Sequence, residues 1–174
     1  ALALAVMHLG AGQLRTKGAL LKPHGTMAVI GPGTGLGVGG VVQTAQGWQA
    51  LAGEGGHSTL APGDDFESEI LRAVRQHFDH VSAERLLSGI GLPVLHRAVA
   101  DVLGQPVAEA WAAEQIMERG LARSDEAASR SLDAFCSFLG GFAGDEALAL
   151  GARGGIYIAG GIVPRMEERF FASA

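Results

Sequence analysis

Four glycines alternate along the segment Gly31-Pro32-Gly33-Thr34-Gly35-Leu36-Gly37, between two apolar runs that favour β-strands. The run before it covers Met27 to Ile30, and the run after it, Val38 to Thr44, is rich in β-branched residues. A turn at residues 45–47 and a strand over Trp48 to Leu51 complete a predicted hairpin. Because glycine readily adopts positive φ, we expect this loop to turn tightly and to leave backbone amides free for an anion.

The Thr34 hydroxyl would add a further donor to such a phosphate-binding loop. A dinucleotide fingerprint needs a helix directly after its glycines, and a strand is predicted here instead. A Walker loop needs a Gly-Lys-Ser/Thr sequence, which the chain lacks. Two interpretations remain, a strand–loop–strand phosphate grip and a glycine-rich hairpin without a ligand.

The chain after the hairpin predicts several helices. Asp64 or Asp65 suits the N-cap of the first, whose apolar face would hold Ile70, Leu71, Val74 and Phe78. Further helices are predicted from Ser82, over Leu92 to Leu103, over Val107 to Arg119, from Ser124 towards Leu150, and over Pro164 to Phe171. A last strand covers Gly155 to Ala159. This order predicts an α/β domain with an antiparallel hairpin at one side of its sheet.

The long helix from Ser124 would present Leu132, Phe135, Leu139 and Phe142 on its apolar face. Three glycines, Gly140, Gly141 and Gly144, lower the helix propensity of this segment. We expect them to interrupt the helix and to admit another backbone or a ligand.

The two ends of the sequence predict that it is a fragment of a longer polypeptide. Ala1 to Leu9 is apolar and suits a buried helix, but it is too short to span a membrane. The chain ends on an amphipathic helix at Phe170 to Ala174. We therefore expect truncation at both ends.

Composition excludes several classes of function. The hydrophobic fraction is 48%, the charged fraction 18% and the net charge −5, so the chain should be globular and offers no basic surface for nucleic acid or an anionic membrane. Cys136 is the only cysteine, which excludes a disulfide framework and a multi-thiolate zinc site. A reduced, cytoplasmic setting fits this composition.

Polar residues that core packing does not explain follow the hairpin, in the segment Gly53-Glu54-Gly55-Gly56-His57. A carboxylate accepts protons from two sugar hydroxyls, and an imidazole can both donate and accept. The alternative is a solvated polar loop. Glu84 follows Ser82 in a first helical turn, where a carboxylate often only complements the helix dipole.

Gly160 and Gly161 follow the last strand and precede a helix. A strand end without side chains would let an adenine or a ribose lie against the backbone. A plain strand-to-helix turn is the alternative.

Taken together, these segments resemble the bacterial glucokinase family, and the resemblance spans nearly the whole chain. The segments that carry it are Gly31 to Gly37, Gly53 to His57, Val81-Ser82-Ala83-Glu84-Arg85-Leu86-Leu87-Ser88-Gly89, and Gly154 to Arg165 with Ala159-Gly160-Gly161. The Glu-Gly-Gly-His and Ser-Ala-Glu-Arg parts are specific, whereas the glycine-rich loops are widely shared. The absence of a cysteine cluster separates the chain from the related repressor/ORF/kinase branch.

The resemblance implies a ribonuclease H-like fold, the actin-like ATPase large lobe of a sugar kinase, with residues 1–174 as a single C-terminal lobe. It implies that Glu54, His57 and Glu84 bind glucose hydroxyls. Gly33, Thr34 and Gly35 would approach the phosphates of ATP, and Gly160 and Gly161 would lie beside the adenosine. ATP and Mg²⁺ are implied as cofactors, and the family is compatible with a homodimer.

The family also implies residues that the chain lacks. Its Asp-x-Gly-Gly-Thr phosphate motif does not occur, and its catalytic aspartate would lie just before Ala1. Asp145 stands where the family has asparagine. The expected reaction of the intact protein is phosphorylation of glucose to glucose 6-phosphate, with no useful activity from the 174 residues alone. Two alternatives stay open, a non-catalytic sugar-binding or regulatory domain of the same superfamily and a nucleotide-dependent oxidoreductase.

Overall fold

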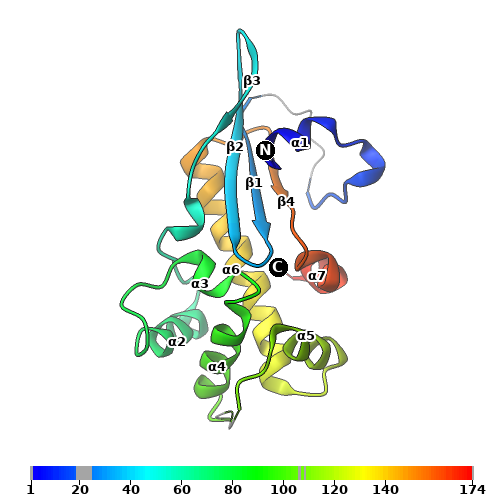
Figure 1. The fold of residues 1–174 in the computed structure, drawn as a ribbon. Coiled ribbons are helices and arrows are strands. Elements are labelled where there is room, and N and C mark those ends of the chain that lie inside the picture. Colours follow the sequence, from blue (N-terminus) through cyan, green and yellow to red (C-terminus); the bar gives the residue numbers. More distant parts are fainter. Residues whose placement is uncertain (1, 19–24, 106, 108, 174) are drawn as a thin grey trace.

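The computed structural model describes residues 2–18, 25–105, 107 and 109–173, and it contains a mixed four-stranded sheet with most of the helices gathered beyond one end of it (Figure 1). The strands are β1 (Met27–Pro32), β2 (Leu36–Thr44), β3 (Gly47–Leu51) and β4 (Ile156–Ile158), in the order β3-β2-β1-β4. β2 pairs antiparallel with both β1 and β3, whereas β4 lies parallel to β1. The predicted hairpin and the predicted last strand are confirmed.

The two faces of the sheet pack against different parts of the chain. Met27 and Val29 belong to a small apolar cluster that includes Val41, with Val6 of the N-terminal segment packed against it. Ile30 belongs instead to the main core, which continues into the helices. Because successive side chains of a strand point to opposite faces, β1 is covered on both sides, whereas β3 is largely exposed.

Helices occupy most of the chain beyond the hairpin. They are α1 (Leu2–Ala5), α2 (Asp65–Val74), α3 (Ala83–Leu86), α4 (Leu92–Val102), α5 (Ala113–Ala122), α6 (Glu126–Leu150) and α7 (Glu167–Ala172). Short 3₁₀ helices cover Val6–His8, Ala11–Gln13, Gly55–His57 (η3) and Val163–Met166 (η4). Helix α6 contacts β1, and in Figure 1 it passes behind the sheet. No helix of the described residues is long and apolar enough to cross a membrane.

The helix caps follow the sequence pattern. Asp64 is the N-cap of α2 and accepts a hydrogen bond from the backbone N–H of Glu67 at 2.7 Å. Asp125 caps α6 in the same way, and Gly151 ends it in the left-handed conformation. The apolar face predicted for α6, with Leu132, Phe135, Leu139 and Phe142, is fully buried.

The predicted interruption of α6 at its glycines was wrong. The helix continues without interruption through Gly140, Gly141 and Gly144. A Cβ at any of the three would meet no atom within 4 Å, so no other backbone approaches them in the described chain. Burial of the opposite face holds the helix together despite the propensity cost of glycine.

Two further predictions about helices were wrong. The helix expected from Val107 begins at Ala113, because Ala112 is extended and its N–H donates to the side chain of Gln115 at 3.0 Å; Ala108 lies outside the described residues. The helix expected to be buried over residues 1–9 is α-helical only to Ala5. Leu4 and Leu9 are exposed, because this segment contacts the sheet on one side and nothing in the described chain covers its other side.

Candidate functional site

The loop between β1 and β2 consists of Gly33, Thr34 and Gly35, since Pro32 and Leu36 still pair across the hairpin. The N–H of Gly33 donates to the carbonyl oxygen of Gly35 at 2.8 Å and closes the turn. The prediction of positive φ was wrong for every glycine in the segment 31–37. Pairing with the neighbouring strand keeps the outer two extended, and the inner two turn the chain within ordinary φ values.

Two backbone amides of this loop are candidate anion donors. The N–H groups of Thr34 and Gly35 have no hydrogen-bond acceptor among the described residues. Thr34 is exposed, so its hydroxyl is also accessible. The loop therefore presents donors to solvent, as a phosphate grip requires, although it does so without left-handed glycines.

The loop is held from the side by the segment that joins α3 to α4. The N–H of Gly89 donates to the carbonyl oxygen of Gly33 at 2.7 Å, and that of Ile90 donates to Thr34 at 3.4 Å. These bonds use the carbonyls of Gly33 and Thr34 and leave the N–H groups of Thr34 and Gly35 without an acceptor among the described residues. The phosphate loop is thus fixed by a segment more than fifty residues away in the sequence.

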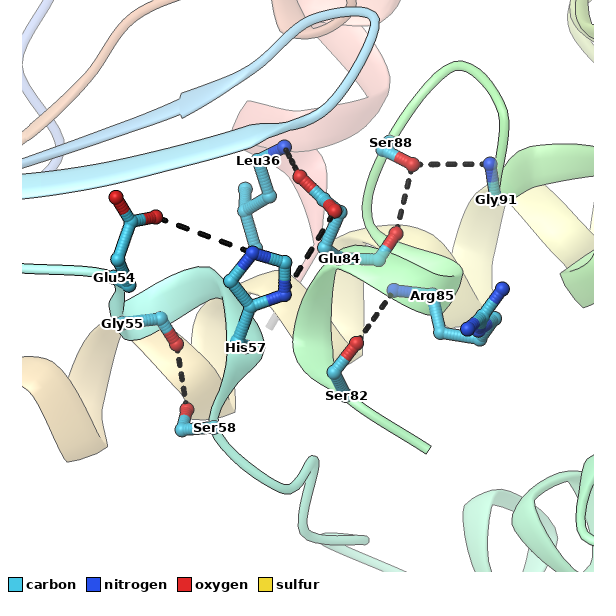
Figure 2. A network of polar contacts seen from close by, with 10 residues as sticks. All are labelled: Leu36, Glu54, Gly55, His57, Ser58, Ser82, Glu84, Arg85, Ser88 and Gly91. Carbon is cyan, nitrogen blue, oxygen red and sulfur yellow. Dashed lines mark hydrogen bonds and ion pairs between the residues drawn. The ribbon is translucent and has the colours of Figure 1, made fainter. Parts of the chain in front are cut away.

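Ser88 anchors this joining segment from within the core. Its side chain is fully buried, and its hydroxyl donates to the carbonyl oxygen of Glu84 at 2.7 Å while it accepts from the N–H of Gly91 at 3.0 Å. One hydroxyl therefore ties the first turn of α3 to the N-cap of α4 (Figure 2).

The three polar residues predicted to bind sugar lie together. Figure 2 shows the ring of His57 between the carboxylates of Glu54 and Glu84. His57 Nε2 lies 4.0 Å from Glu54 Oε2, and His57 Nδ1 lies 4.0 Å from Glu84 Oε1. The side chains of Glu54 and His57 are 90% and 64% exposed and that of Glu84 is 27% exposed, so polar atoms face solvent on an open surface.

The glycines between Glu54 and His57 are required by packing. A Cβ at Gly56 would overlap the carbonyl oxygen of Leu36. A Cβ at Gly55 would lie 2.8 Å from Val38 Cγ1 and 3.2 Å from Glu146 Oε1. Helix η3 therefore rests directly on the start of β2, and this contact sets the position of His57.

Glu84 reaches the phosphate loop as well as the polar cluster. Its Oε2 accepts a hydrogen bond from the backbone N–H of Leu36 at 2.8 Å. A Cβ at Gly35 would lie only 2.5 Å from the same oxygen. The absence of a side chain at Gly35 thus has a reason that the sequence did not reveal, since it admits this carboxylate. The predicted position of Glu84 in the first turn of α3 is confirmed. Glu84 does more than complement the helix dipole, because its carboxylate accepts a hydrogen bond from another segment.

The Gly160-Gly161 turn lies at the same end of the sheet as the phosphate loop. Gly160 has a φ of +83°, and a Cβ there would overlap the carbonyl oxygen of Pro32. Gly161 borders open space. Gly160 is therefore explained by close packing on β1, whereas Gly161 leaves room for a ligand.

One acidic residue of α6, Glu146, lies beside η3, and Asp145 precedes it in the helix. Glu146 is partly buried beside Gly55, and burial, with a smaller contribution from the charge of Asp145, raises the pKa of its carboxyl group. Asp145 itself is exposed. Sequence reasoning missed Leu36, Ser88 and Glu146, because their parts in the site depend on contacts between distant segments.

Comparison with known proteins identifies the family of the chain. The family model described as glucokinase matches residues 1–174. The chain belongs to the glucokinase family. It is 49% identical over 171 residues to the glucokinase of Chromobacterium violaceum. The aligned region covers 98% of this chain and 49% of that protein. The chain thus spans about half the length of the curated glucokinases it matches.

Solved glucokinase structures share the fold. The glucokinase of an Antarctic psychrotroph superposes with a TM-score of 0.91 at 40% identity, covering 98% of this chain and 53% of that one. The glucokinase of Balamuthia mandrillaris, solved in complex with glucose, superposes with a TM-score of 0.67 at 22% identity, covering 88% of this chain and 46% of that one. The predicted fold class, that of actin-like ATPase sugar kinases, is confirmed.

Proposed function

We propose that this chain supplies the glucose-binding and phosphate-binding part of an ATP-dependent glucokinase. The observation that carries the proposal is the convergence of Glu54, His57 and Glu84 beside a loop in which two amides have no acceptor among the described residues. Family membership supports the same conclusion. Residues 1–174 would act as one lobe of the enzyme.

The polar cluster has the chemistry to bind a sugar. The carboxylates of Glu54 and Glu84 can each accept hydrogen bonds from sugar hydroxyls. The imidazole of His57 can donate a hydrogen bond to one hydroxyl and accept one from another. Their exposure leaves these atoms available to a ligand. Charge-assisted hydrogen bonds that a hydroxyl donates to a carboxylate are stronger than neutral ones, which favours a polyhydroxylated substrate. Glucose is the substrate we propose.

The hairpin loop would bind the phosphoryl donor. The N–H groups of Thr34 and Gly35, which have no acceptor in the described part of the chain, suit phosphate oxygens, as does the Thr34 hydroxyl. The N–H of Gly33 closes the turn. The Gly160-Gly161 turn would lie beside the adenosine, with Gly161 open to it.

Mg²⁺ would neutralise charge on the phosphates of ATP when it is bound. Among the described residues no group of three His, Cys, Asp or Glu side chains could hold a metal ion. The proposal therefore assigns no metal ligand to this chain.

In the proposed reaction the 6-hydroxyl oxygen of glucose attacks the γ-phosphorus of ATP. The bond from that phosphorus to the bridging oxygen breaks, ADP leaves, and the hydroxyl proton passes to a general base. None of the site residues described above is offered as that base. Loss of a positioned base costs about 10²–10⁴-fold in rate, so we expect no useful turnover from the 174 residues alone.

The single buried cysteine and the absence of disulfides support a cytoplasmic setting.

The test uses a full-length hybrid, in which this chain replaces the matching half of the Chromobacterium violaceum glucokinase. Glu54→Gln combined with His57→Ala should raise the glucose KM at least about tenfold, since hydrogen bonds to charged groups contribute roughly 1.5–3 kcal/mol each. Exposed His77 and Glu114 lie outside the cluster, so His77→Ala with Glu114→Gln is the matched control.

Unchanged glucose KM and kcat in the Glu54/His57 variant would refute the assignment of these residues. A hybrid that binds glucose but transfers no phosphate would favour a non-catalytic sugar-binding domain instead.

A further inference from the structure

The two carboxylate oxygens of Glu84 face two different parts of the site. Oε2 accepts the backbone N–H of Leu36 at 2.8 Å, and Oε1 lies 4.0 Å from His57 Nδ1 (Figure 2). Leu36 is the first residue after the phosphate loop. The hydrogen bond joins residues 48 positions apart, so it is a tertiary contact and not part of a local turn.

The phosphate loop has little freedom to move independently of this carboxylate. Gly35 lies so close to Glu84 Oε2 that a Cβ there would be 2.5 Å from it. On the other side of the loop, the N–H of Gly89 holds the carbonyl of Gly33, and Ser88 ties Gly89's segment back to the main chain of Glu84. Both ends of the loop are thus fixed through the same short stretch of α3 and its continuation.

We propose that Glu84 is a positioning residue for the phosphate loop, and that through it binding at the sugar cluster and binding at the phosphate loop influence each other. The proposal rests on the function proposed above. A ligand hydroxyl that donates to Oε1 fixes the orientation of the whole carboxylate, and with it the hydrogen bond that Oε2 accepts from the N–H of Leu36. Bound sugar should therefore raise the affinity of the loop for phosphate. Thermodynamic linkage makes this effect reciprocal, so an occupied loop raises the affinity of the cluster for sugar by the same factor.

The first experiment measures the Kd of a non-hydrolysable ATP analogue for the full-length hybrid without sugar, by calorimetry. Glu84→Gln and Glu84→Ala both remove the charge, but only glutamine keeps an oxygen that can accept from Leu36 N–H. Glu84→Ala should therefore bind the analogue about three- to tenfold more weakly than Glu84→Gln, as expected for loss of one hydrogen bond. His77→Ala should bind it within about twofold of the unsubstituted hybrid, because His77 is exposed and lies outside both the loop and the polar cluster.

The second measurement separates positioning from a general loss of structure. In steady-state assays, Glu84→Gln should raise the KM for glucose while keeping the KM for ATP, whereas Glu84→Ala should raise both. Equal analogue affinity in the two Glu84 variants would overturn the proposal.

If Glu84→Ala fails to fold, Gly35→Ala tests the same link from the other side, because its methyl group would displace Oε2. It should weaken both glucose and analogue binding, and unchanged glucose affinity would overturn the proposal. An unsubstituted hybrid that binds neither ligand would instead contradict the proposed function, and the present proposal would fail with it.

Discussion

Gly56 packs against the carbonyl oxygen of Leu36 so closely that no side chain fits between them. This contact seats η3, which carries His57, on the first residue of β2. Gly56→Ala should therefore push His57 away from Glu84 and raise the glucose KM of the full-length hybrid about fivefold or more, because overpacking of this kind typically costs about 1–3 kcal/mol.

Gly53 is the matched control for this prediction. It lies in the same segment, but a Cβ there would meet nothing within 4 Å. Gly53→Ala should leave the glucose KM within about twofold of the unsubstituted hybrid, as for most surface substitutions. Equal KM values for the two alanine variants would show that the Gly56–Leu36 contact does not position the site.

The parts of the fold that depend on local chemistry were predictable. The β-branched run of β2, the Asp64 cap of α2 and the apolar face of α6 each follow from residues within a few positions of one another. The resemblance brought Glu54, His57 and Glu84 together as sugar ligands, and the structure confirms that they are neighbours. Their role as ligands stays a prediction.

Contacts between distant segments could not be predicted. Gly35 was expected to provide a positive φ, but the structure shows that its missing side chain admits Glu84 Oε2. The helix predicted from Val107 begins only at Ala113, and the residue before its N-cap, Trp111, stacks on His96 of α4 instead. In both cases a tertiary partner overrode a local pattern.

His96 predicts how stability depends on pH. Its ring is buried, stacks on Trp111 with centroids 4.9 Å apart, and has an Nε2 atom without a hydrogen-bond partner among the described residues. Burial lowers the pKa of His96 from its ordinary value of 6.5, opposed by a smaller effect of the Asp125 charge. The unfolded chain therefore takes up a proton at a higher pH than the folded chain does.

Because the unfolded state binds more protons, the free energy of unfolding should fall as the pH is lowered through 6.5 towards the pKa of folded His96. His96→Phe keeps an aromatic ring against Trp111 and removes the titrating group. Urea unfolding of the 174-residue chain at several pH values between 7 and 5 should show a smaller decline for this variant. An identical decline in both proteins would assign the effect to other groups.

Cys136 should be inert in the folded chain. It is buried, and burial raises the pKa of its thiol to about 11. At pH 8 roughly one thiol in a thousand would then be the reactive thiolate, even if a reagent could reach it. A colorimetric thiol reagent should therefore release no signal from the native chain and one equivalent after denaturation. Rapid labelling under native conditions would show that α6 is not packed as described.

Two leucines of α6 offer a matched test of the core. The side chain of Leu132 is fully buried among the aromatic residues of the main core, whereas Leu148 is 83% exposed on the same helix. Leu132→Ala removes the same atoms as Leu148→Ala and leaves a cavity, so it should lower the free energy of unfolding by about 2–5 kcal/mol. Leu148→Ala should change it by less than about 0.5 kcal/mol, because its side chain is already in water and alanine favours helix. Urea unfolding of both variants measures the difference. Comparable losses at the two positions would contradict this prediction. They would mean that the buried face of α6, which packs against α4 and α5, does not stabilise the fold.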